Sequence, residues 1–474
     1  MLFKPYRHSL IQHKIPEWYQ DAKLGIFIHW GLYSVPAWAE PGDINQLIKE
    51  KGHGPHFTNN PYAEWYHNTY QIPGSPAQQY HNEKYGDEIT YKDFVPMFEE
   101  CSKDADMNLW ASLFKQAGAE YVVMVTKHHD GYCLWPTEQE NPVSPNYHVK
   151  RDFVGELADC CRVKGMKFGI YYSGLLDWSV RNFTITDSYT FTKCYQQNRK
   201  YIRYAVGQIK ELIEKYKPAI LWNDIGFPWG YNLKKLFSFY YNTVSKGVIN
   251  DRWKQDFVPK ASFLQPLVKR ICRKIDENTH GIDFGTREDK KFWYDYDTME
   301  YATHDDIQPD KWELIRGVGH SFGYNQMETE EDFLSGLDLV WMLVDTVSKN
   351  GNLLLNIGPK PDGSIPREQY NVLTYLGEWM EYAGEGIYGS RPNLETALYM
   401  EHYPFIRYTK NDRNTFVFIK GKKGQEFRAV GIDAASYNVT PLFDISKASL
   451  IVDDHDISVL YEEDYVAALK LTKK

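Results

Sequence analysis

Up to about residue 390 the chain alternates between short apolar runs and longer amphipathic stretches. Each apolar run is five to seven residues long, as expected for strands that are buried on both faces of a sheet. The fifth, sixth and seventh of the eight runs are less apolar than the others. Eight strands are predicted: Gly25–His29, Tyr121–Thr126, Lys167–Ser173, Ala219–Asp224, Val248–Arg252, Asp297–Tyr301, His320–Tyr324 and Asn352–Ile357.

Many of the stretches between these runs have helical periodicity. Five helices are predicted: Asp104–Ala117, Phe153–Lys164, Asn198–Tyr216, Glu331–Ser348 and Arg367–Tyr382. Strands that alternate with helices predict a parallel sheet, and eight such units predict an α/β fold of the (β/α)8 barrel type. Because Trp253–Trp293 is long, with one amphipathic piece, and Asp305–Arg316 allows only a short helix, the barrel should be irregular in its fifth and sixth units.

The pattern changes after Gly389–Pro392, where short alternating runs are separated by turn residues. They predict six strands: Phe405–Tyr408, Thr415–Ile419, Glu426–Val430, Leu450–Val452, Ser458–Tyr461 and Val466–Leu471. Such runs are typical of a small antiparallel β-sandwich. The predicted organisation is therefore a catalytic barrel over residues 1–388 and a C-terminal β-sandwich over residues 389–474.

Composition narrows the choice of partner. The 474 residues carry 54 basic and 63 acidic side chains, a net charge of -9, which argues against nucleic acid or an anionic membrane as partner. No apolar run reaches the roughly 18 residues that a membrane span needs. The N-terminal segment has no apolar core or cleavage site of a signal peptide, which predicts a cytoplasmic protein; a lost leader would instead mean a secreted or periplasmic one.

Polar, charged and aromatic residues lie at the predicted C-terminal ends of the strands, where barrel enzymes place their catalytic and binding residues. Asp224 ends an apolar run, so its carboxylate should emerge from the core into the cleft. Glycosidases use two carboxylates, and Glu300 is the second candidate, with Asp295, Asp297 and Glu64 as rivals. Together with the aromatic share of 16%, which fits either a large core or surfaces that stack on sugar rings, these residues predict a carbohydrate pocket.

A metal site is the main alternative, because His128, His129 and Asp130 follow one another. Adjacent residues on a strand point to opposite faces, so both histidines reach one ion only where the strand ends. No spacing such as H-E-x-x-H supports zinc. The sequence therefore predicts no metal and no cofactor, and a metal-dependent hydrolase on a barrel stays open to a test by chelation.

Seven segments resemble, in order, those of the α-L-fucosidases of glycoside hydrolase family 29. They are Lys23–Gly31, Asn60–Trp65, Thr126–Gly131, Phe168–Ser173, Leu221–Asp224, Asn250–Trp253 and Gly351–Pro359. The resemblance covers about residues 15–390. It implies an irregular barrel followed by a β-sandwich, and an exo-acting enzyme that removes terminal α-L-fucose from oligosaccharides or glycoconjugates with retention of configuration. A homo-oligomer is one of the states that the resemblance allows.

The resemblance also implies roles for individual residues. Asp224 matches the nucleophile, and Glu300 is the expected acid and base because Asp297–Tyr301 matches one branch of the family. Sugar contacts fall on His29, Glu64, Trp65, His128, His129, Tyr171, Trp222 and Arg252. Fucose carries a methyl group on C5, for which Phe322 with Trp222 is the expected apolar wall.

Retention further predicts that the two carboxyl groups lie about 5–5.5 Å apart, with Asp224 ionised and Glu300 protonated at rest. Two other functions remain open at this stage. The first is a non-catalytic fucose-binding protein on the same scaffold. The second is a related glycosidase that acts on α-L-galactosides, which differ from fucosides only at the C5 substituent.

Overall fold

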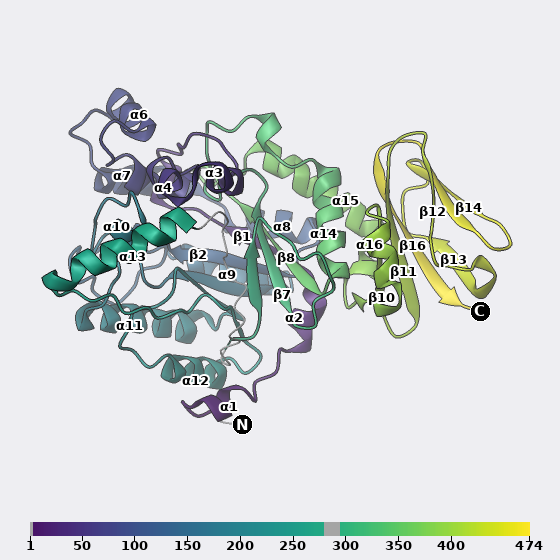
Figure 1. Cartoon of the computed structure of the whole chain (residues 1–474), viewed down its shortest axis with the longest axis horizontal. Helices are drawn as coiled ribbons and strands as arrows, with labels where there is room; N and C mark the ends of the chain where they lie inside the picture. Colours follow the sequence, from purple (N-terminus) through teal and green to yellow (C-terminus); the bar gives the residue numbers. More distant parts are fainter. Residues whose placement is uncertain (1–2, 279–293) are drawn as a thin grey trace.

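A curled sheet of parallel strands forms the centre of the larger lobe in this computed structural model, which describes residues 3–278 and 294–474 (Figure 1). The strand order is β5-β4-β3-β2-β1-β8-β7-β6. The strands are β1 Leu24–Ile28, β2 Tyr121–Lys127, β3 Lys167–Ser173, β4 Ile220–Asp224, β5 Val248–Ile249, β6 Asp297–Glu300, β7 Trp312–Gly317 and β8 Gly351–Ile357. A parallel bridge between Asn250 and Tyr296 joins the two edge strands, which confirms an irregular (β/α)8-like barrel.

Six helices that follow strands of the barrel bury one face against the sheet. They are α8 Met107–Gln116, α9 Phe153–Val163, α11 Arg199–Tyr216, α12 Leu233–Thr243, α14 Gly336–Ser348 and α15 Arg367–Ile387. Polar side chains begin several of them: Asp106 accepts from two backbone N–H groups of α8, and Asp152 and Asn198 cap α9 and α11. The five predicted helices are therefore present, with slightly different ends.

The other described helices lie mostly in the connections. They are α1 Arg7–Leu10, α2 Glu17–Ala22, α3 Ile44–Lys51, α4 His53–Thr58, α5 Tyr66–Thr69, α6 Pro76–Tyr85, α7 Phe94–Cys101, α10 Ser188–Lys193, α13 Gln265–Asn278 and α16 Ala397–His402. The long connection from β1 to β2 holds α3 to α7, none of which was predicted. Among the described residues no helix has the length and apolar character needed to cross a bilayer.

The seventh predicted strand was wrong. His320–Tyr324 is a loop, and β7 is Trp312–Gly317, which overlaps a segment predicted as a short helix. The error comes from Glu313, a charged residue that interrupts an apolar run yet is fully buried inside the barrel. Its Oε2 accepts hydrogen bonds from Tyr19 (2.9 Å) and Tyr121 (2.8 Å), and its Oε1 accepts one from Trp222 (3.2 Å). A buried carboxylate whose partners come from distant parts of the chain cannot be distinguished from a surface carboxylate in the sequence.

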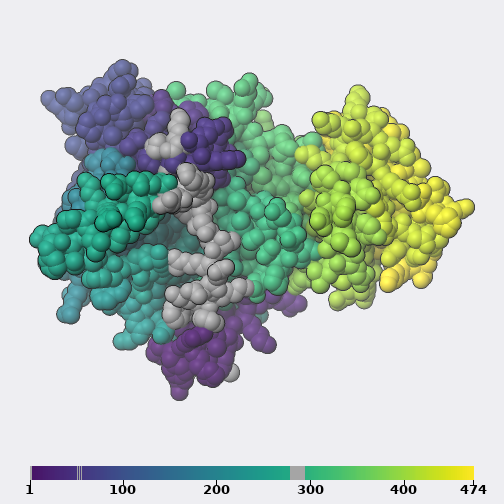
Figure 2. Space-filling model, in the orientation of Figure 1, coloured from purple at the N-terminus to yellow at the C-terminus, as the bar shows by residue number. Residues whose placement is uncertain are grey.

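The C-terminal strands form two antiparallel sheets, ordered β13-β16-β11-β10-β9 and β12-β15-β14, which confirms the predicted sandwich. The strands are β9 Arg391–Pro392, β10 Ile406–Lys410, β11 Asn414–Gly421, β12 Glu426–Arg428, β13 Tyr437–Pro441, β14 Ala448–Val452, β15 Ile457–Tyr461 and β16 Tyr465–Lys473. This lobe lies against α14 and α15 on one side of the barrel (Figure 2). Trp379 of α15 donates to the carbonyl of Val466 at 2.8 Å, and Arg407 pairs with Asp345 of α14 at 2.6 Å.

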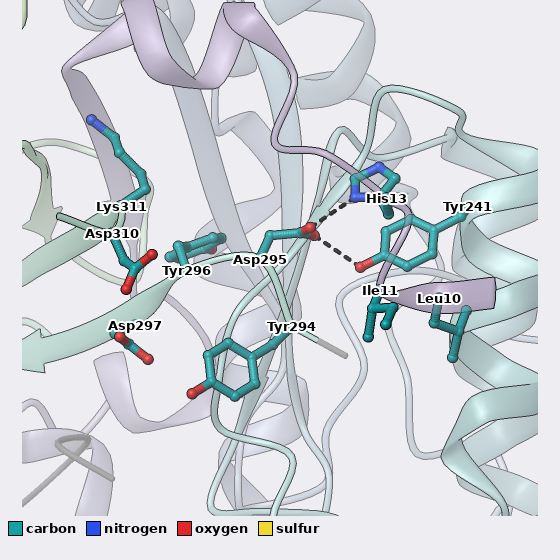
Figure 3. A pocket seen from close by; sticks show the side chains of 10 residues that line it. All are labelled: Leu10, Ile11, His13, Tyr241, Tyr294, Asp295, Tyr296, Asp297, Asp310 and Lys311. Carbon is teal, nitrogen blue, oxygen red and sulfur yellow. Dashed lines mark hydrogen bonds and ion pairs between the residues drawn. The ribbon is translucent and has the colours of Figure 1, made fainter. Parts of the chain in front are cut away.

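A cavity of about 280 Å³ lies at the N-terminal ends of β6 and β7 (Figure 3). Asp295 is its central polar group: it pairs with His13 (2.7 Å) and accepts from the Tyr241 hydroxyl (2.9 Å) and the Ile249 N–H (2.8 Å). Asp297 also lines this cavity. Both aspartates thus lie at the wrong end of the strands to act with Asp224, and Asp295 instead ties β5 to the segment that precedes β6.

Candidate active site

All the site residues that the sequence singles out line one pocket at the C-terminal ends of the strands. They are His29, Glu64, Trp65, His128, His129, Tyr171, Trp222, Asp224, Arg252, Glu300 and Phe322. The pocket is completed by residues that were not selected: Phe27, Ile44, His56, Asn60, Tyr62, Ile225 and Ile315. Tyr62 lies inside the Asn60–Trp65 segment, so position in that segment was the available signal.

One guanidinium group connects the two carboxylates. Arg252 donates from Nη1 to Asp224 Oδ1 at 3.2 Å and from Nη2 to Glu300 Oε2 at 3.0 Å. Its Nε donates to Thr298 Oγ1 at 2.9 Å, which fixes the plane of the group. Each carboxylate has a second donor: Tyr171 binds Asp224 Oδ2 at 2.9 Å, and Tyr62 binds Glu300 Oε1 at 3.0 Å.

The surroundings shift the pKa values of Asp224 and Glu300 in opposite directions. Burial raises the pKa of Asp224, but the charge of Arg252, the neighbouring His129 and the Tyr171 hydroxyl outweigh it, so this pKa is below its usual value. For Glu300 burial prevails: its pKa is raised, Arg252 opposes the rise only in part, and the charge of Asp224 adds to it. Two carboxyl groups separated in this way suit one charged and one protonated role.

The third carboxyl group in the pocket has a different environment. Glu64 accepts from the Gly323 N–H at 2.8 Å and from Ser321 Oγ at 3.3 Å, and burial raises its pKa to about 7. It is anchored to the loop after β7. With Asp295 and Asp297 at the other end of the strands, Glu300 is the candidate that shares a cation with Asp224.

In two of the pocket histidines Nδ1 is the hydrogen-bond donor, which leaves Nε2 as an acceptor. His29 Nδ1 lies 2.6 Å from Asn356 Oδ1, and because the Asn356 amide nitrogen donates to the Phe322 carbonyl, His29 Nδ1 is the donor. His129 Nδ1 lies 2.7 Å from Ser173 Oγ, whose own proton goes to a backbone carbonyl. Burial lowers the pKa of His29 to about 3 and that of His129 to about 4. Both rings are therefore neutral acceptors at Nε2.

His128 is the third histidine considered in the pocket. Its Nδ1 is buried and has no hydrogen-bond partner within the residues that the structure describes. Burial also lowers the pKa of this ring, so it too is neutral. Both neighbouring histidines reach the same pocket because β2 ends at Lys127, with an irregular register after Val125.

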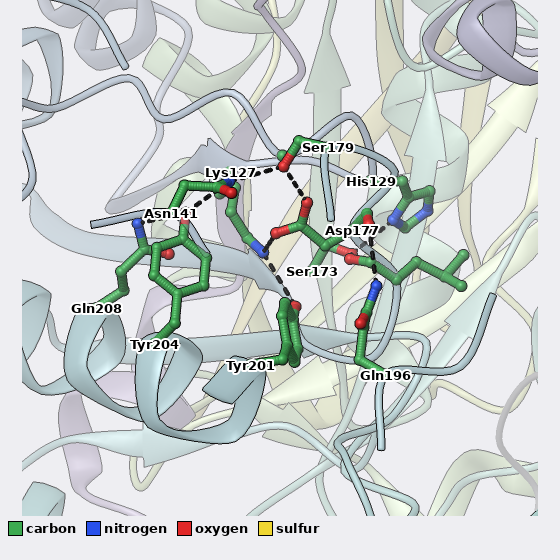
Figure 4. A network of polar contacts seen from close by, with 12 residues as sticks. Lys127, His129, Asn141, Ser173, Asp177, Ser179, Gln196, Tyr201, Tyr204 and Gln208 are labelled. Carbon is green, nitrogen blue, oxygen red and sulfur yellow. Dashed lines mark hydrogen bonds and ion pairs between the residues drawn. The ribbon is translucent and has the colours of Figure 1, made fainter. Parts of the chain in front are cut away.

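A buried ion pair fixes the end of β2 (Figure 4). Lys127 Nζ donates to Asp177 at 2.8 Å and to the Tyr201 hydroxyl at 3.2 Å, and it lies 4.4 Å from the centre of the Tyr172 ring. Asp177 belongs to the loop after β3, which also supplies Trp178 against the ring of His129. The Lys127–Asp177 pair, which was not predicted from the sequence, holds the segment that carries His128 and His129 against the loop after β3.

Backbone strain follows both central carboxylates. Ile225 has φ 59° and Tyr301 has φ 51°, values that cost a β-branched or bulky residue free energy. Such conformations persist where the surrounding structure determines them, often at functional sites. Here each strained residue directly follows a carboxylate that contacts Arg252.

The remaining wall is apolar. The Trp222 ring stacks on Tyr171 with centres 5.4 Å apart, while its N–H points away from the pocket to Glu313. Phe322 packs beside His29 and Tyr62. A small ligand with several hydroxyls and one apolar group fits this mixture of acceptors and rings. In the part of the chain that is described, no three His, Cys, Asp or Glu side chains are placed to hold a metal ion together.

Comparison with known proteins gives a consistent picture. Residues 2–385 match the family model described as Alpha-L-fucosidase. The chain is 32% identical to the α-L-fucosidase of Dictyostelium discoideum, over 82% of this chain and 75% of that protein. It is 30% identical to human tissue α-L-fucosidase, over 82% and 72%. A crystal structure of Thermotoga maritima α-fucosidase with a mechanism-based inhibitor is 35% identical, with a TM-score of 0.78 over 99% of this chain and all of that one.

Proposed function

The chain belongs to the α-L-fucosidase family of glycoside hydrolases, and from this premise we propose that it hydrolyses terminal α-L-fucosides by a retaining double displacement. Asp224 is the nucleophile and Glu300 is the acid and base. The observation that carries the proposal is that Arg252 contacts both carboxylates while their surroundings shift their pKa values in opposite directions. The mechanism-based inhibitor bound to the Thermotoga maritima relative supports a covalent route.

In the first step the Asp224 carboxylate attacks the anomeric carbon of fucose. The bond to the leaving-group oxygen breaks, and the proton of Glu300 passes to that oxygen. In the second step Glu300, now a carboxylate, takes a proton from water, and the water oxygen displaces Asp224 from the anomeric carbon. Negative charge thus moves from one carboxylate to the other, and Arg252 lies against it in both halves of the reaction.

Recognition follows from the rest of the pocket. The neutral histidines His29, His128 and His129 accept hydrogen bonds from the sugar hydroxyls. Phe322 and Trp222 face the C5 methyl group of fucose. An α-L-galactoside would place a hydroxyl against this apolar wall and lose water from it there, so fucose is the preferred sugar. The proposed substrates are fucosylated oligosaccharides or glycoconjugates.

The test is the hydrolysis of an aryl α-L-fucoside by the wild type and by Asp224→Gly, with and without azide. The wild type should turn over, the variant should be nearly inactive, and azide should restore turnover with β-fucosyl azide as product, because azide takes the place of the missing carboxylate. Asp305→Gly, at an exposed aspartate outside the pocket, serves as the matched control and should behave like the wild type. Wild-type activity in Asp224→Gly without azide would contradict the assignment.

A further inference from the structure

Two large aromatic rings are exposed together on loops that start at the wall of the pocket. Trp229, in the loop after β4, is 50% exposed, and Phe257, in the loop after β5, is 57% exposed. Their ring centres lie 4.8 Å apart. A single exposed apolar side chain needs no explanation, but two that are half in water while touching one another form an apolar patch.

Both loops begin at the wall of the pocket. Ile225 and Arg252 line it, and Trp229 and Phe257 follow them by four and five residues. The loops are hydrogen-bonded to each other where they leave the pocket: the Gly226 N–H donates to the Arg252 carbonyl at 3.2 Å, and the Phe227 N–H donates to the Lys254 carbonyl at 2.7 Å. The aromatic pair is therefore the outward continuation of the pocket wall that carries Asp224 and Arg252.

The backbone around Trp229 is held in place although its ring is exposed. Pro228 precedes it, and Gly230 follows with φ 98°, a conformation that favours glycine. The Gln255 amide nitrogen donates both to the Pro228 carbonyl (2.8 Å) and to the Tyr231 carbonyl (2.9 Å), so one side chain fixes the loop on both sides of the tryptophan. A ring that is rigidly presented to solvent can bind a flat partner with little loss of conformational entropy.

The position of Glu300 shows which side the leaving group occupies. A general acid has to lie beside the oxygen that it protonates, so the sugar attached to fucose leaves the pocket past Glu300. Glu300 ends β6, and its Oε2 accepts a hydrogen bond at 3.0 Å from Nη2 of Arg252, which lies at the start of the loop after β5. The loop after β5, which carries Phe257, therefore borders the side from which the leaving group extends.

We propose that Trp229 and Phe257 form a subsite for the sugar ring next to the fucose, with the apolar face of a pyranose stacked on the pair. The inference rests on the proposed function and adds to it a binding site for the second sugar, which favours fucosylated oligosaccharides over fucosides with a small leaving group. The chemistry is that of sugar–aromatic stacking, because the axial C–H groups on one face of a pyranose present an apolar surface to a π-system.

The test compares two substrates that share fucose and differ in what is attached to it. One is α-L-fucosyl fluoride, whose leaving group is too small to touch the subsite, and the other is a fucosylated trisaccharide. In Trp229→Ala and Phe257→Ala, kcat/KM for the trisaccharide should fall about tenfold, as expected for one lost stacking contact, while kcat/KM for the fluoride stays unchanged. Trp229→Phe, which keeps a ring, should retain most of the trisaccharide activity.

Tyr382→Ala is the matched control, because Tyr382 is a similarly exposed aromatic residue near the end of α15. It should leave both substrates unaffected. Equal losses on both substrates, or no loss on the trisaccharide, would overturn the subsite while leaving the proposed function intact. If the wild type hydrolyses neither substrate, the proposed function itself fails and the subsite fails with it.

Discussion

Replacement of Arg252 by methionine should move the pH profile of hydrolysis upward. Arg252 has a side chain that is only 13% exposed, and it pairs with Asp224 and Glu300 at 3.2 and 3.0 Å. Methionine removes the charge while keeping an apolar chain of similar length. An adjacent cation lowers the pKa of a carboxyl group by roughly 1–3 units, and its loss should raise the pKa of Asp224 by a similar amount. Glu300 loses the same opposing charge, so its pKa should rise further as well.

The consequence can be worked out for each limb of the profile. In kcat/KM the acidic limb reports ionisation of Asp224, and the basic limb reports loss of the proton from Glu300. Both limbs should shift upward, the acidic one by roughly 1–3 pH units, which corresponds to about 1.4–4 kcal/mol of lost stabilisation of the ionised nucleophile. Below the shifted limb, kcat/KM should fall about tenfold for each pH unit.

The assay measures kcat/KM for an aryl α-L-fucoside between pH 4 and pH 9. Arg252→Lys is the companion variant: it keeps a positive charge but not the two-pronged geometry, so its limbs should stay close to those of the wild type although its plateau is lower. Unshifted limbs in Arg252→Met would refute the reasoning, because Arg252 would then not control the ionisation of the carboxylates.

Four further outcomes follow from the structure. Burial raises the pKa of Glu313 to about 7, so the folded state binds a proton at Glu313 more tightly than the unfolded state does, and the free energy of unfolding of the wild type should decrease as pH rises from about 4.5 to about 7. In urea unfolding, Glu313→Gln should remove up to about 3 kcal/mol of that decrease. An identical pH dependence in both proteins would contradict this. Gly131→Ala would place a methyl group 2.3 Å from an Asp177 oxygen at φ 81°, and should cost about 2 kcal/mol or more and lower the Tm; an unchanged Tm would show that the Lys127 pair adapts. Phe322→Ser should improve the ratio of α-L-galactoside to α-L-fucoside hydrolysis about tenfold, whereas an unchanged ratio would remove Phe322 from the methyl-binding wall. Dialysis against EDTA should leave kcat/KM unaltered, and a loss that zinc restores would instead favour the metal-dependent hydrolase.

Much of the barrel could be predicted because its strands are buried on both faces. Runs such as Tyr121–Thr126 and Asn352–Ile357 are mostly apolar and lie within one residue of the observed strands. The seventh strand was missed because β7 contains Glu313, so local hydrophobicity does not mark it. Its position is set by pairing with strands far away in the sequence. The fifth strand was predicted at the right place, but β5 has only two residues before polar residues follow.

The site was partly predictable for the same reason. Residues at strand ends, such as Asp224 and Glu300, could be assigned to one cleft, and the structure brings them together around Arg252. Contacts between distant segments could not be derived, among them the bond from Tyr62 to Glu300 and the pairing of Lys127 with Asp177. Whether both adjacent histidines face the pocket depended on where β2 ends, and an alternating pattern gives no signal for that position.

The most direct test of the account is to trap the covalent intermediate. The wild type is incubated with 2-deoxy-2-fluoro-α-L-fucosyl fluoride, whose fluorine slows the second step more than the first, and the protein is digested and analysed by mass spectrometry. A fluorofucosyl group on the peptide that contains Asp224, present in the wild type and absent from Asp224→Gly, is the predicted result. Inactivation with the label on another residue such as Glu300, or turnover of the α-fucoside that yields β-fucose as the first product, would contradict the proposed mechanism.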